Sequence, residues 1–187
     1  MQNMKQELDK RVAEGSINAV KMGDLTLYNY SHRCVYEKRW DEYTMAARGL
    51  VLRDSGEIVA RPWKKFFNLG ERPDDKLPAE TPELSRKYDG SLLIVFFDSV
   101  RWRAVTRGCW ENAQTQYAAK WLGIHGGKLQ KSFTYLFELI APWNRIVVHY
   151  PKEDMILLGM VETASGQDFS YNETRMYALL WDLTPVE

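Results

Sequence analysis

The sequence predicts an α+β fold in which antiparallel sheets carry flanking helices. Three observations lead to this class. Long apolar and β-branched runs recur along the chain and are typical of strands. Clear amphipathic-helix spacing is confined to two segments, residues 2–14 and 111–122. A short Asp-Ser-Gly turn separates two of the strand-like runs, which favours antiparallel hairpins.

The composition is that of one globular domain of 187 residues, 45% hydrophobic and 27% charged. Basic and acidic residues both number 25, so the net charge is zero. This excludes a uniformly basic nucleic-acid coat but not a local basic groove. Cys34 and Cys109 are too few for a disulfide framework or a four-cysteine zinc site. No apolar run reaches about 18 residues, and the N-terminus lacks a signal core, so we expect a cytoplasmic protein without a membrane partner.

The first third of the chain predicts a helix, a strand and a hairpin. Residues 2–14 carry apolar side chains at every fourth position among charges, and Gly15 ends this helix. Residues 25–36 are rich in Tyr, Thr and Val and are typical of a strand. Residues 48–63 predict a hairpin whose turn lies at 54–56.

The middle of the chain begins with a loop. Residues 71–83 hold three of the seven prolines and much charge, which indicates a surface loop and the one plausible internal linker. A turn and a strongly apolar run over 85–99 follow, and residues 100–107 alternate large and charged side chains as a hairpin partner would.

The last third predicts one helix and several strands. Residues 111–122 place apolar side chains on one helical face, and Gly123 and the 126–127 glycine pair end that helix. Strands are predicted at 133–140, 145–150 and 155–162. Residues 176–183 fit either a strand or a helix.

The segment Lys87-Tyr88-Asp89-Gly90-Ser91 is the one most indicative of chemistry. Lys87 follows a proline-rich loop and precedes an apolar strand, a position at the lip of a pocket. A lysine amine is nucleophilic only when neutral, and burial beside other cations favours that form. Such cations could also hold a polyphosphate, and the candidates are Arg48, Arg61, Lys64, Lys65, Arg103 and Arg107.

The motif alone does not decide its own meaning. Lys-x-Asp-Gly occurs by chance at roughly 1 in 8,000 positions, so about 2% of chains this long carry one. The alternative is a surface lysine that leads into a turn.

The surroundings of Lys87 resemble a known family. KYDGSLLIVFF is similar to motif I of the covalent nucleotidyltransferases, which include ATP-dependent ligases and mRNA capping enzymes. More closely, the chain resembles the phage T4-type RNA ligase 1 family, over about residues 28 to 171. The matching segments, in order along the chain, are ARGLVLRDSGEIVARPWKKFFNLGE, FELIAPWNRIVVHY (motif III) and LLGMVETASGQDFSY.

The resemblance implies a single nucleotidyltransferase domain over residues 1–187, with an ATP-grasp-like ligase core. It implies that Lys87 attacks the α-phosphate of ATP, releases pyrophosphate and carries AMP as a phosphoramidate. The AMP would pass to the 5′-phosphate of an RNA, such as a cleaved tRNA, and an RNA 3′-hydroxyl would then displace it. Mg²⁺ is the expected metal, with no ligand assigned. The cytoplasm of a phage-infected host is one expected setting.

Three residues upstream of Lys87 match the family's nucleotide-binding positions. Arg48 would contact the nucleotide phosphates; its alternative is an ion pair with Asp41 or Glu42. Lys65 would meet phosphate, and Phe67 would pack under the nucleotide. The alternative is that Phe67 or its neighbour Phe66 is simply a core residue.

Upstream, Tyr30 matches a nucleotide-binding tyrosine of the family. The remaining matches lie around and after Lys87. Arg107 falls where the family has a basic residue; lysine is expected there, so the charge is kept and the geometry changes. Glu138 would accept hydrogen bonds from the ribose hydroxyls, and a glutamate within an apolar strand is expensive to bury without a partner. Asp89 is expected to shape the loop, and Gly90 to let backbone approach a ligand closely.

The chain departs from the family after Glu138. The Glu-Gly of motif IV and the Lys-x-Lys of motif V do not follow, and the last lysine is Lys152. We therefore expect a domain incomplete at its C-terminus: a fragment, a shortened relative, or one half of a ligase whose second chain carries motifs IV and V. Each missing phosphate-holding group commonly costs about 10²–10³ in rate, so self-adenylylation by this chain alone should be severely impaired. The alternatives are a non-catalytic nucleotide- or RNA-binding module and a capping-type guanylyltransferase.

Overall fold

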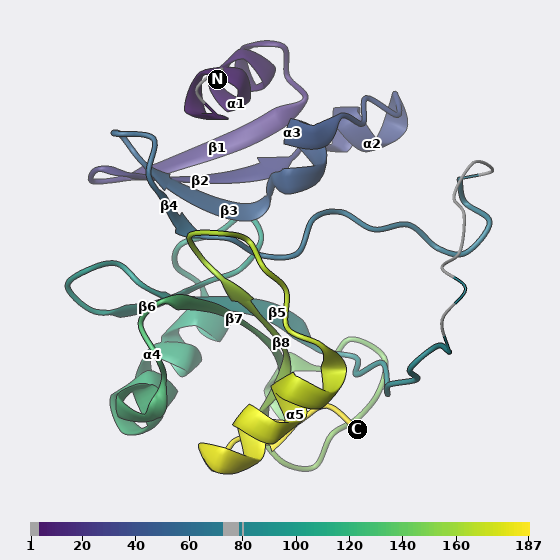
Figure 1. The fold of residues 1–187 in the computed structure, drawn as a ribbon, viewed down its shortest axis with the longest axis vertical. Coiled ribbons are helices and arrows are strands. Elements are labelled where there is room, and N and C mark those ends of the chain that lie inside the picture. Colours follow the sequence, from purple (N-terminus) through teal and green to yellow (C-terminus); the bar gives the residue numbers. More distant parts are fainter. Residues whose placement is uncertain (1–3, 73–78, 80) are drawn as a thin grey trace.

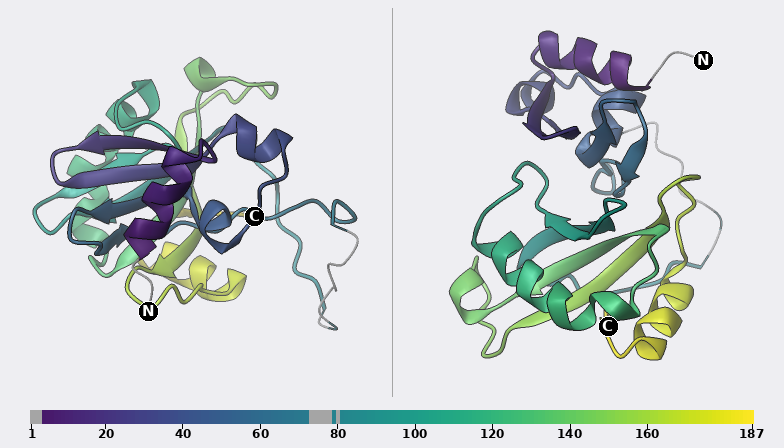
Figure 2. Two further views of the ribbon diagram at one scale, coloured as in Figure 1. Left: turned by 90° about the horizontal axis from the view of Figure 1, so that it is seen from above. Right: turned by 90° about the vertical axis from the view of Figure 1, so that its left-hand side faces the viewer.

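A computed structural model describes residues 4–72, 79 and 81–187, whose helices and strands form four layers (Figure 1). Helices α1 (Met4–Ala13) and α3 (Glu42–Ala46) cover a four-stranded sheet. A five-stranded sheet lies beneath it, and helices α4 (Ala113–His125) and α5 (Tyr171–Leu180) cover the far face of that sheet. Figure 2 shows the two sheets stacked between the helices. The predicted α+β class with antiparallel sheets is confirmed.

The first sheet is antiparallel throughout and has the order β1-β2-β3-β4. Its strands are β1 (Ile17–Met22), β2 (Leu25–Tyr30), β3 (Arg48–Arg53) and β4 (Ile58–Ala60). The predicted hairpin is the β3–β4 pair, but β1 was not predicted. The strand expected over 25–36 is wrong beyond Tyr30, because the Ser31 side chain accepts a hydrogen bond from the Cys34 N–H at 3.1 Å and caps helix α2 (His32–Tyr36).

The second sheet has the order β6-β5-β7-β8-β9, antiparallel except for the short β8–β9 pair. Its strands are β5 (Ser91–Phe97), β6 (Trp102–Val105), β7 (Phe133–Ile140), β8 (Asp154–Glu162) and β9 (Thr184–Pro185). The predicted hairpin partner of the apolar run after Lys87 is β6.

Two predictions in the last third are wrong, and one ambiguity is resolved. Residues 145–150 form no strand: they follow the short helix η2 (Pro142–Asn144), and their apolar side chains at 146–148 are exposed. Helix α4 runs through Gly123 and is capped at Gly126. The segment expected to be strand or helix is helix as far as Leu180, with Ser170 as its N-cap.

The apolar side chains fill the three spaces between these layers, as the alternation on β5 shows. Ile94 and Phe96 point to the space between the two sheets, where Leu27 and Val51 of the first sheet meet them. Leu93 and Val95 belong to the core under α4 and α5, and a third cluster lies between α1, α3 and the first sheet. This period-2 alternation packs both faces of β5.

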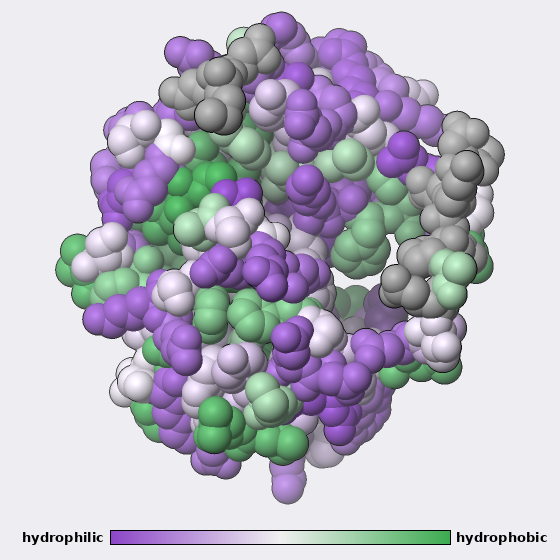
Figure 3. Space-filling model, viewed as in Figure 1, coloured by the Kyte–Doolittle hydropathy of each residue, from purple (hydrophilic) through white to green (hydrophobic). Residues whose placement is uncertain are grey.

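The connection from β4 to β5, residues 61–90, has no helix or strand in its described part and runs along the outside of the stack (Figure 1). The predicted linker at 71–83 falls largely within residues 73–78 and 80, outside the described residues. Hydrophilic residues predominate on the face in Figure 3, where hydrophobic residues form separate patches. Within the described part of the chain, no helix has the length and apolarity needed to cross a membrane.

Candidate active site

Lys87 lies at the rim of a cavity of about 390 Å³. It precedes Gly90, the last residue before β5, by three positions. Phe66 and Glu138 line the same cavity. The side chain of Lys87 is exposed, as befits the lip of a pocket, so burial does not supply the activation that the sequence suggested. The reason is local: the preceding residues 81–86 are all exposed, and only Tyr88 anchors the segment to the core.

Glu138 reaches this cavity from the neighbouring strand. It pairs with Leu92 across β5–β7 and shares with Leu136 the side of β7 that faces the first sheet. Its Oε1 accepts a hydrogen bond from the Gly90 N–H at 2.9 Å. Burial raises the pKa of Glu138, while this bond and the nearby charge of Lys87 act in the opposite direction. The hydrogen-bond partner expected for a glutamate within an apolar strand is thus the backbone N–H of Gly90.

Asp89 and Gly90 organise the turn before β5. The Asp89 carboxylate accepts hydrogen bonds from the Val147 and Val148 N–H groups, both at 2.7 Å, which hold the pKa of Asp89 below its ordinary value. These bonds are the contacts on which its loop-shaping role rests. A Cβ at Gly90 would overlap the Leu139 carbonyl oxygen, so the close backbone approach here is made by β7.

Arg48 begins β3, and the glycine after it brings this strand close to the second sheet. Gly49 has φ +95°, and a Cβ there would lie 3.3 Å from the Arg107 Cα. The Arg48 Nη1 is buried and has no hydrogen-bond partner among the described residues, and the Phe66 ring lies 5.0 Å from the guanidinium. Burial and the charge of Arg107 lower the pKa of Arg48.

The surface alternative for Arg48 is not realised, since Asp41 instead pairs with Arg11. A guanidinium that is buried, unpaired by acids and incompletely hydrogen-bonded fits an anionic ligand.

An aromatic cluster joins the remaining predicted residues. Arg107 donates from Nη1 to the Tyr30 hydroxyl at 2.8 Å. The Trp40 ring contacts Tyr30 and Phe67, with centroids 5.2 and 5.5 Å apart. The Lys65 Nζ lies 4.1 Å from the Phe67 centroid and donates to the Phe66 carbonyl. Trp40 was missed by sequence reasoning, because nothing marks it there except its aromatic character.

Neither phenylalanine of the Lys-Phe-Phe-Asn segment belongs to a core cluster. Phe66 is 62% exposed and Phe67 is half-buried, so the alternative that one of them is a core residue is wrong.

Three basic side chains of this region, Arg48, Lys65 and Arg107, lie over aromatic rings. Among the ion pairs of the described residues, none involves Arg48, Lys65, Lys87 or Arg107. Without a direct ion pair, these cations can bind a polyanion, although Glu138 lies close enough to interact with Lys87 and Arg48.

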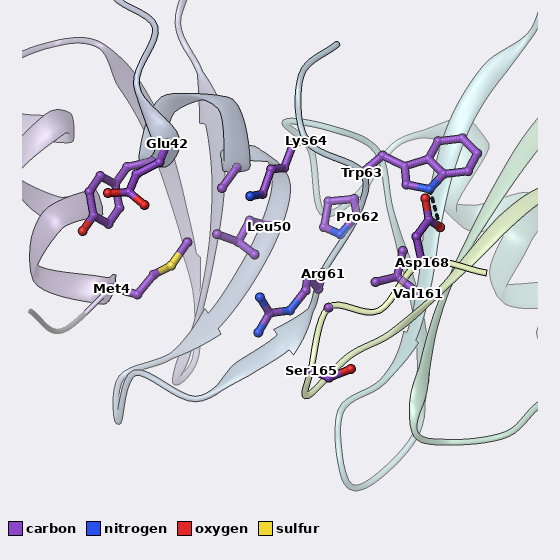
Figure 4. A pocket seen from close by; sticks show the side chains of 13 residues that line it. Met4, Glu42, Leu50, Arg61, Pro62, Trp63, Lys64, Val161, Ser165 and Asp168 are labelled. Carbon is purple, nitrogen blue, oxygen red and sulfur yellow. Dashed lines mark hydrogen bonds between the residues drawn. The ribbon is translucent and has the colours of Figure 1, made fainter. Parts of the chain in front are cut away.

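Three other candidate cations lie elsewhere. Arg61 and Lys64 line a separate cavity of about 350 Å³ on the side of α3 (Figure 4). Arg61 donates to the Thr163 and Ala164 carbonyls there. Arg103 forms an ion pair with Asp98 at the other end of β5. The expected proximity to Lys87 is wrong for Arg103, because β6 carries it to the far end of β5. The cavity of Arg61 and Lys64 shares Trp63 with the Lys87 cavity.

No group of three or more His, Cys, Asp or Glu side chains within the described residues is arranged to hold a metal ion. Glu138 is the carboxylate that lines the Lys87 cavity. Mg²⁺ commonly binds through substrate phosphates and one or two carboxylates, so this donor set fits a metal that arrives with a nucleotide.

Comparison with known proteins decides the family. A family described as RNA ligase matches residues 46–185. The chain belongs to this RNA ligase family. The match includes Arg48, Lys65, Lys87, Arg107 and Glu138.

Two relatives show how much of the chain is similar in sequence to other RNA ligase family proteins. An RNA ligase of Rhodothermus phage RM378 is 27% identical over 191 residues, which cover 74% of this chain and 41% of that protein. A protein of Thermovibrio ammonificans is 32% identical over 130 residues, 64% of this chain and 34% of its own. This chain thus spans less than half the length of these relatives.

A solved archaeal ATP-dependent RNA ligase shares the fold, with a TM-score of 0.65 and 15% identity over 97% of this chain and 49% of that one. The architecture is therefore that of the nucleotidyltransferase ligases.

Proposed function

We propose that this chain is the nucleotide-binding and adenylyl-transferring part of an ATP-dependent RNA ligase, with Lys87 as its nucleophile. The observation that carries the proposal is that Lys87 and Glu138 line one cavity beside Phe66, whose ring lies 5.0 Å from the Arg48 guanidinium and whose carbonyl accepts a hydrogen bond from Lys65. Arg107 lies beyond them, on the Tyr30 hydroxyl. Three basic groups match the charge of a triphosphate, and the unpartnered Arg48 Nη1 has a donor to offer it.

The cavity offers separate surroundings to each part of ATP. Its walls include the apolar or aromatic side chains of Trp63, Phe66 and Leu158, which suit a purine ring. Glu138 supplies carboxylate oxygens that accept hydrogen bonds from ribose hydroxyls, as the family resemblance implies. A volume of about 390 Å³ lies within the range of small-molecule sites.

The reaction is a sequence of displacements at phosphorus. The neutral Lys87 amine forms an N–P bond to the α-phosphate, the bond to pyrophosphate breaks, and the amine loses a proton. A 5′-phosphate oxygen of RNA then takes the adenylyl group from Lys87. An RNA 3′-hydroxyl attacks that 5′-phosphate, and AMP leaves. Arg48 and Arg107 stabilise the negative charge that builds up at phosphorus. Bound Mg²⁺ would neutralise phosphate charge and would be held chiefly by the phosphates themselves.

The test is covalent labelling. The chain is incubated with α-labelled ATP and Mg²⁺, denatured, and examined for acid-labile label on the protein. Slow labelling is expected on the unchanged chain and on the matched control Lys152→Ala, and it should be lost in Lys87→Ala. Label that persists in Lys87→Ala would refute the assignment of the nucleophile.

The same assay separates the competing functions. Label from GTP but not ATP would indicate a capping-type guanylyltransferase. ATP binding by calorimetry without any label would indicate a nucleotide-binding module, or a half that needs a second chain with further phosphate-holding groups. Addition of such a chain would then restore labelling only if the split-ligase explanation is correct.

A further inference from the structure

The Trp40 side chain lies at the centre of the aromatic cluster and has no role in the function described so far. Its ring meets Tyr30 and Phe67 edge-on, with interplanar angles of 79° and 82°. Among the ring pairs of the described residues, Tyr30 and Phe67 do not contact each other. Trp40 is therefore the ring that joins them.

Each of the two outer rings carries a cation of the proposed site. The Arg107 Nη1 donates to the Tyr30 hydroxyl at 2.8 Å. The Lys65 Nζ lies 4.1 Å from the Phe67 centroid and 5.9 Å from the Trp40 centroid. The two cations thus stand at the ends of one series of contacts, and a change at its middle ring would shift both.

Trp40 is not explained as a core residue. It is half-buried and belongs to none of the hydrophobic clusters of the described residues. The indole nitrogens of Trp63, Trp110 and Trp143 each donate a hydrogen bond, whereas that of Trp40 has no partner in the described part of the chain. What Trp40 contributes to its surroundings is therefore the face and edge of its ring.

The backbone on both sides of Trp40 is held in place. The Arg39 carbonyl accepts a hydrogen bond from the Thr44 hydroxyl at 3.0 Å. The Asp41 carboxylate accepts one from the Thr44 N–H at 2.8 Å, which caps α3, and it also pairs with Arg11. A ring presented from a fixed backbone can fix the side chains that pack against it.

We propose that Trp40 is a positioning residue for adenylyl transfer to Lys87. Its ring holds the two outer rings in place and thereby sets where Lys65 and Arg107 meet the phosphates of ATP. This inference rests on the proposed function and adds to it a residue that acts through its neighbours and touches neither ATP nor the nucleophile.

The contribution of Trp40 should appear in the rate of the reaction rather than in the affinity for ATP. Arg48 lies over Phe66, and Glu138 accepts from the Gly90 N–H, so Trp40 holds neither of them. These groups should still bind ATP when the ring is missing. Stabilisation of the charge that builds up at phosphorus is more sensitive, because a small misplacement of a cation costs a large factor in rate.

The test measures the rate of labelling from α-labelled ATP and Mg²⁺ at saturating ATP, together with ATP affinity by calorimetry. Trp40→Ala should label about tenfold more slowly than the unchanged chain, while its ATP affinity changes by less than about threefold. Trp40→Leu keeps an apolar side chain without the aromatic ring, so it should be slowed as much, and it replaces the alanine variant if that variant unfolds. Trp40→Phe keeps a ring and should label within about threefold of the unchanged rate.

Tyr43→Ala is the matched control. Tyr43 is half-buried like Trp40, its ring lies 4.2 Å from the Arg11 guanidinium, and it packs against the hydrophobic cluster between α1, α3 and the first sheet. This variant should have a lower melting temperature than the unchanged chain but the same labelling rate. The comparison separates the positioning of the cations from the stability of the fold.

Unchanged rates in Trp40→Ala and Trp40→Leu would overturn the inference. A Trp40→Phe variant as slow as Trp40→Ala would also overturn it, because the indole N–H would then act on the ligand directly. The same holds for a slow Tyr43→Ala, which would assign the effect to a general disturbance near α3, and for an ATP affinity that falls as far as the rate. The proposed function fails differently, with no ATP binding or no label on the unchanged chain, and this inference would then fall with it.

Discussion

At the scale of single residues, two features define the candidate site: the half-buried carboxylate of Glu138 and the close packing of the Gly90 backbone. Glu138 lies on a strand whose neighbouring side chains are apolar, and its Oε1 is held by the Gly90 N–H. Gly90 is packed against the Leu139 carbonyl. The partly buried charge lowers the stability of the fold, and the close packing leaves no room for a larger residue at position 90. Functional sites often carry such costs.

Glu138→Gln should stabilise the fold at neutral pH. Burial raises the pKa of Glu138 in the folded chain, so keeping it ionised there opposes folding at every pH above the unfolded value. The gain should be about 1 kcal/mol at pH 7 and should vanish below about pH 4, where the carboxyl is neutral in the unfolded chain too. Urea unfolding at both pH values measures this, and equal gains at both would contradict it. ATP affinity should fall in the same variant.

Two glycines should respond oppositely to alanine. Gly90→Ala forces a methyl group onto the Leu139 carbonyl and should lower the free energy of unfolding by about 1–3 kcal/mol. Gly123→Ala, within α4 and with nothing within 4 Å of a Cβ, should raise it by about 0.5–1 kcal/mol. Denaturant titrations of the two variants provide the comparison. A neutral Gly90→Ala would show that the turn before β5 adjusts without strain.

At the scale of elements, the segment after η2 is held by a side chain rather than by a sheet. Residues 145–150 have the composition of a strand, but the Val147 and Val148 amides donate to Asp89. The Tyr150 hydroxyl also lies 3.0 Å from the Asp89 backbone nitrogen, which donates to it. The turn that carries Lys87 and the segment after motif III are thus joined into one unit.

Asp89→Ala should release this segment. The backbone amides of Val147 and Val148 should then exchange hydrogen faster than in the unchanged chain, while those of β5 keep their rates as an internal control. Because these bonds lower the pKa of Asp89, the stabilisation is present above its unfolded pKa and is lost as pH falls through the lower folded value. Hydrogen exchange followed by mass spectrometry or NMR measures the effect. Unchanged exchange at both amides would show that another contact holds the segment.

At the scale of the whole molecule, the site exists because two sheets pack face to face. Arg48 and Tyr30 come from the first sheet, whereas Glu138 belongs to the second and Lys87 to the segment that leads into it. The shared core of Leu27, Val51, Phe96 and Leu136 holds the sheets together, so the site and the fold should have a common stability.

Leu136→Ala tests this coupling, since its side chain is fully buried between the sheets. The substitution should lower the free energy of unfolding by about 2–5 kcal/mol. Circular dichroism and tryptophan fluorescence should still report one coincident urea transition. Two separate transitions would show that each sheet folds with its own helices as an independent unit.

Local patterns in the chain were sufficient for most of the elements and for two of the site positions. Strand alternation, helix spacing and turn residues act between near neighbours, so β3–β4, β5–β6, α1 and α4 could be predicted. A lysine before an apolar strand and a glutamate within one are likewise visible locally. The side-chain caps that redirect a segment are less visible, which is why the helix after Tyr30 and the loop at 145–150 were missed.

Which cations share the aromatic cluster beside the Lys87 cavity depended on the packing of the sheets. Arg48, Lys65 and Arg107 contact its Phe66, Phe67 and Tyr30 side chains, whereas Arg103 is just as basic in the sequence and pairs with Asp98 at the far end of β5. Trp40 contacts rings from segments far apart along the chain, and the exposure of Lys87 follows from the path of the segment before it. Contacts across space depend on how whole layers stack, and no local pattern records that.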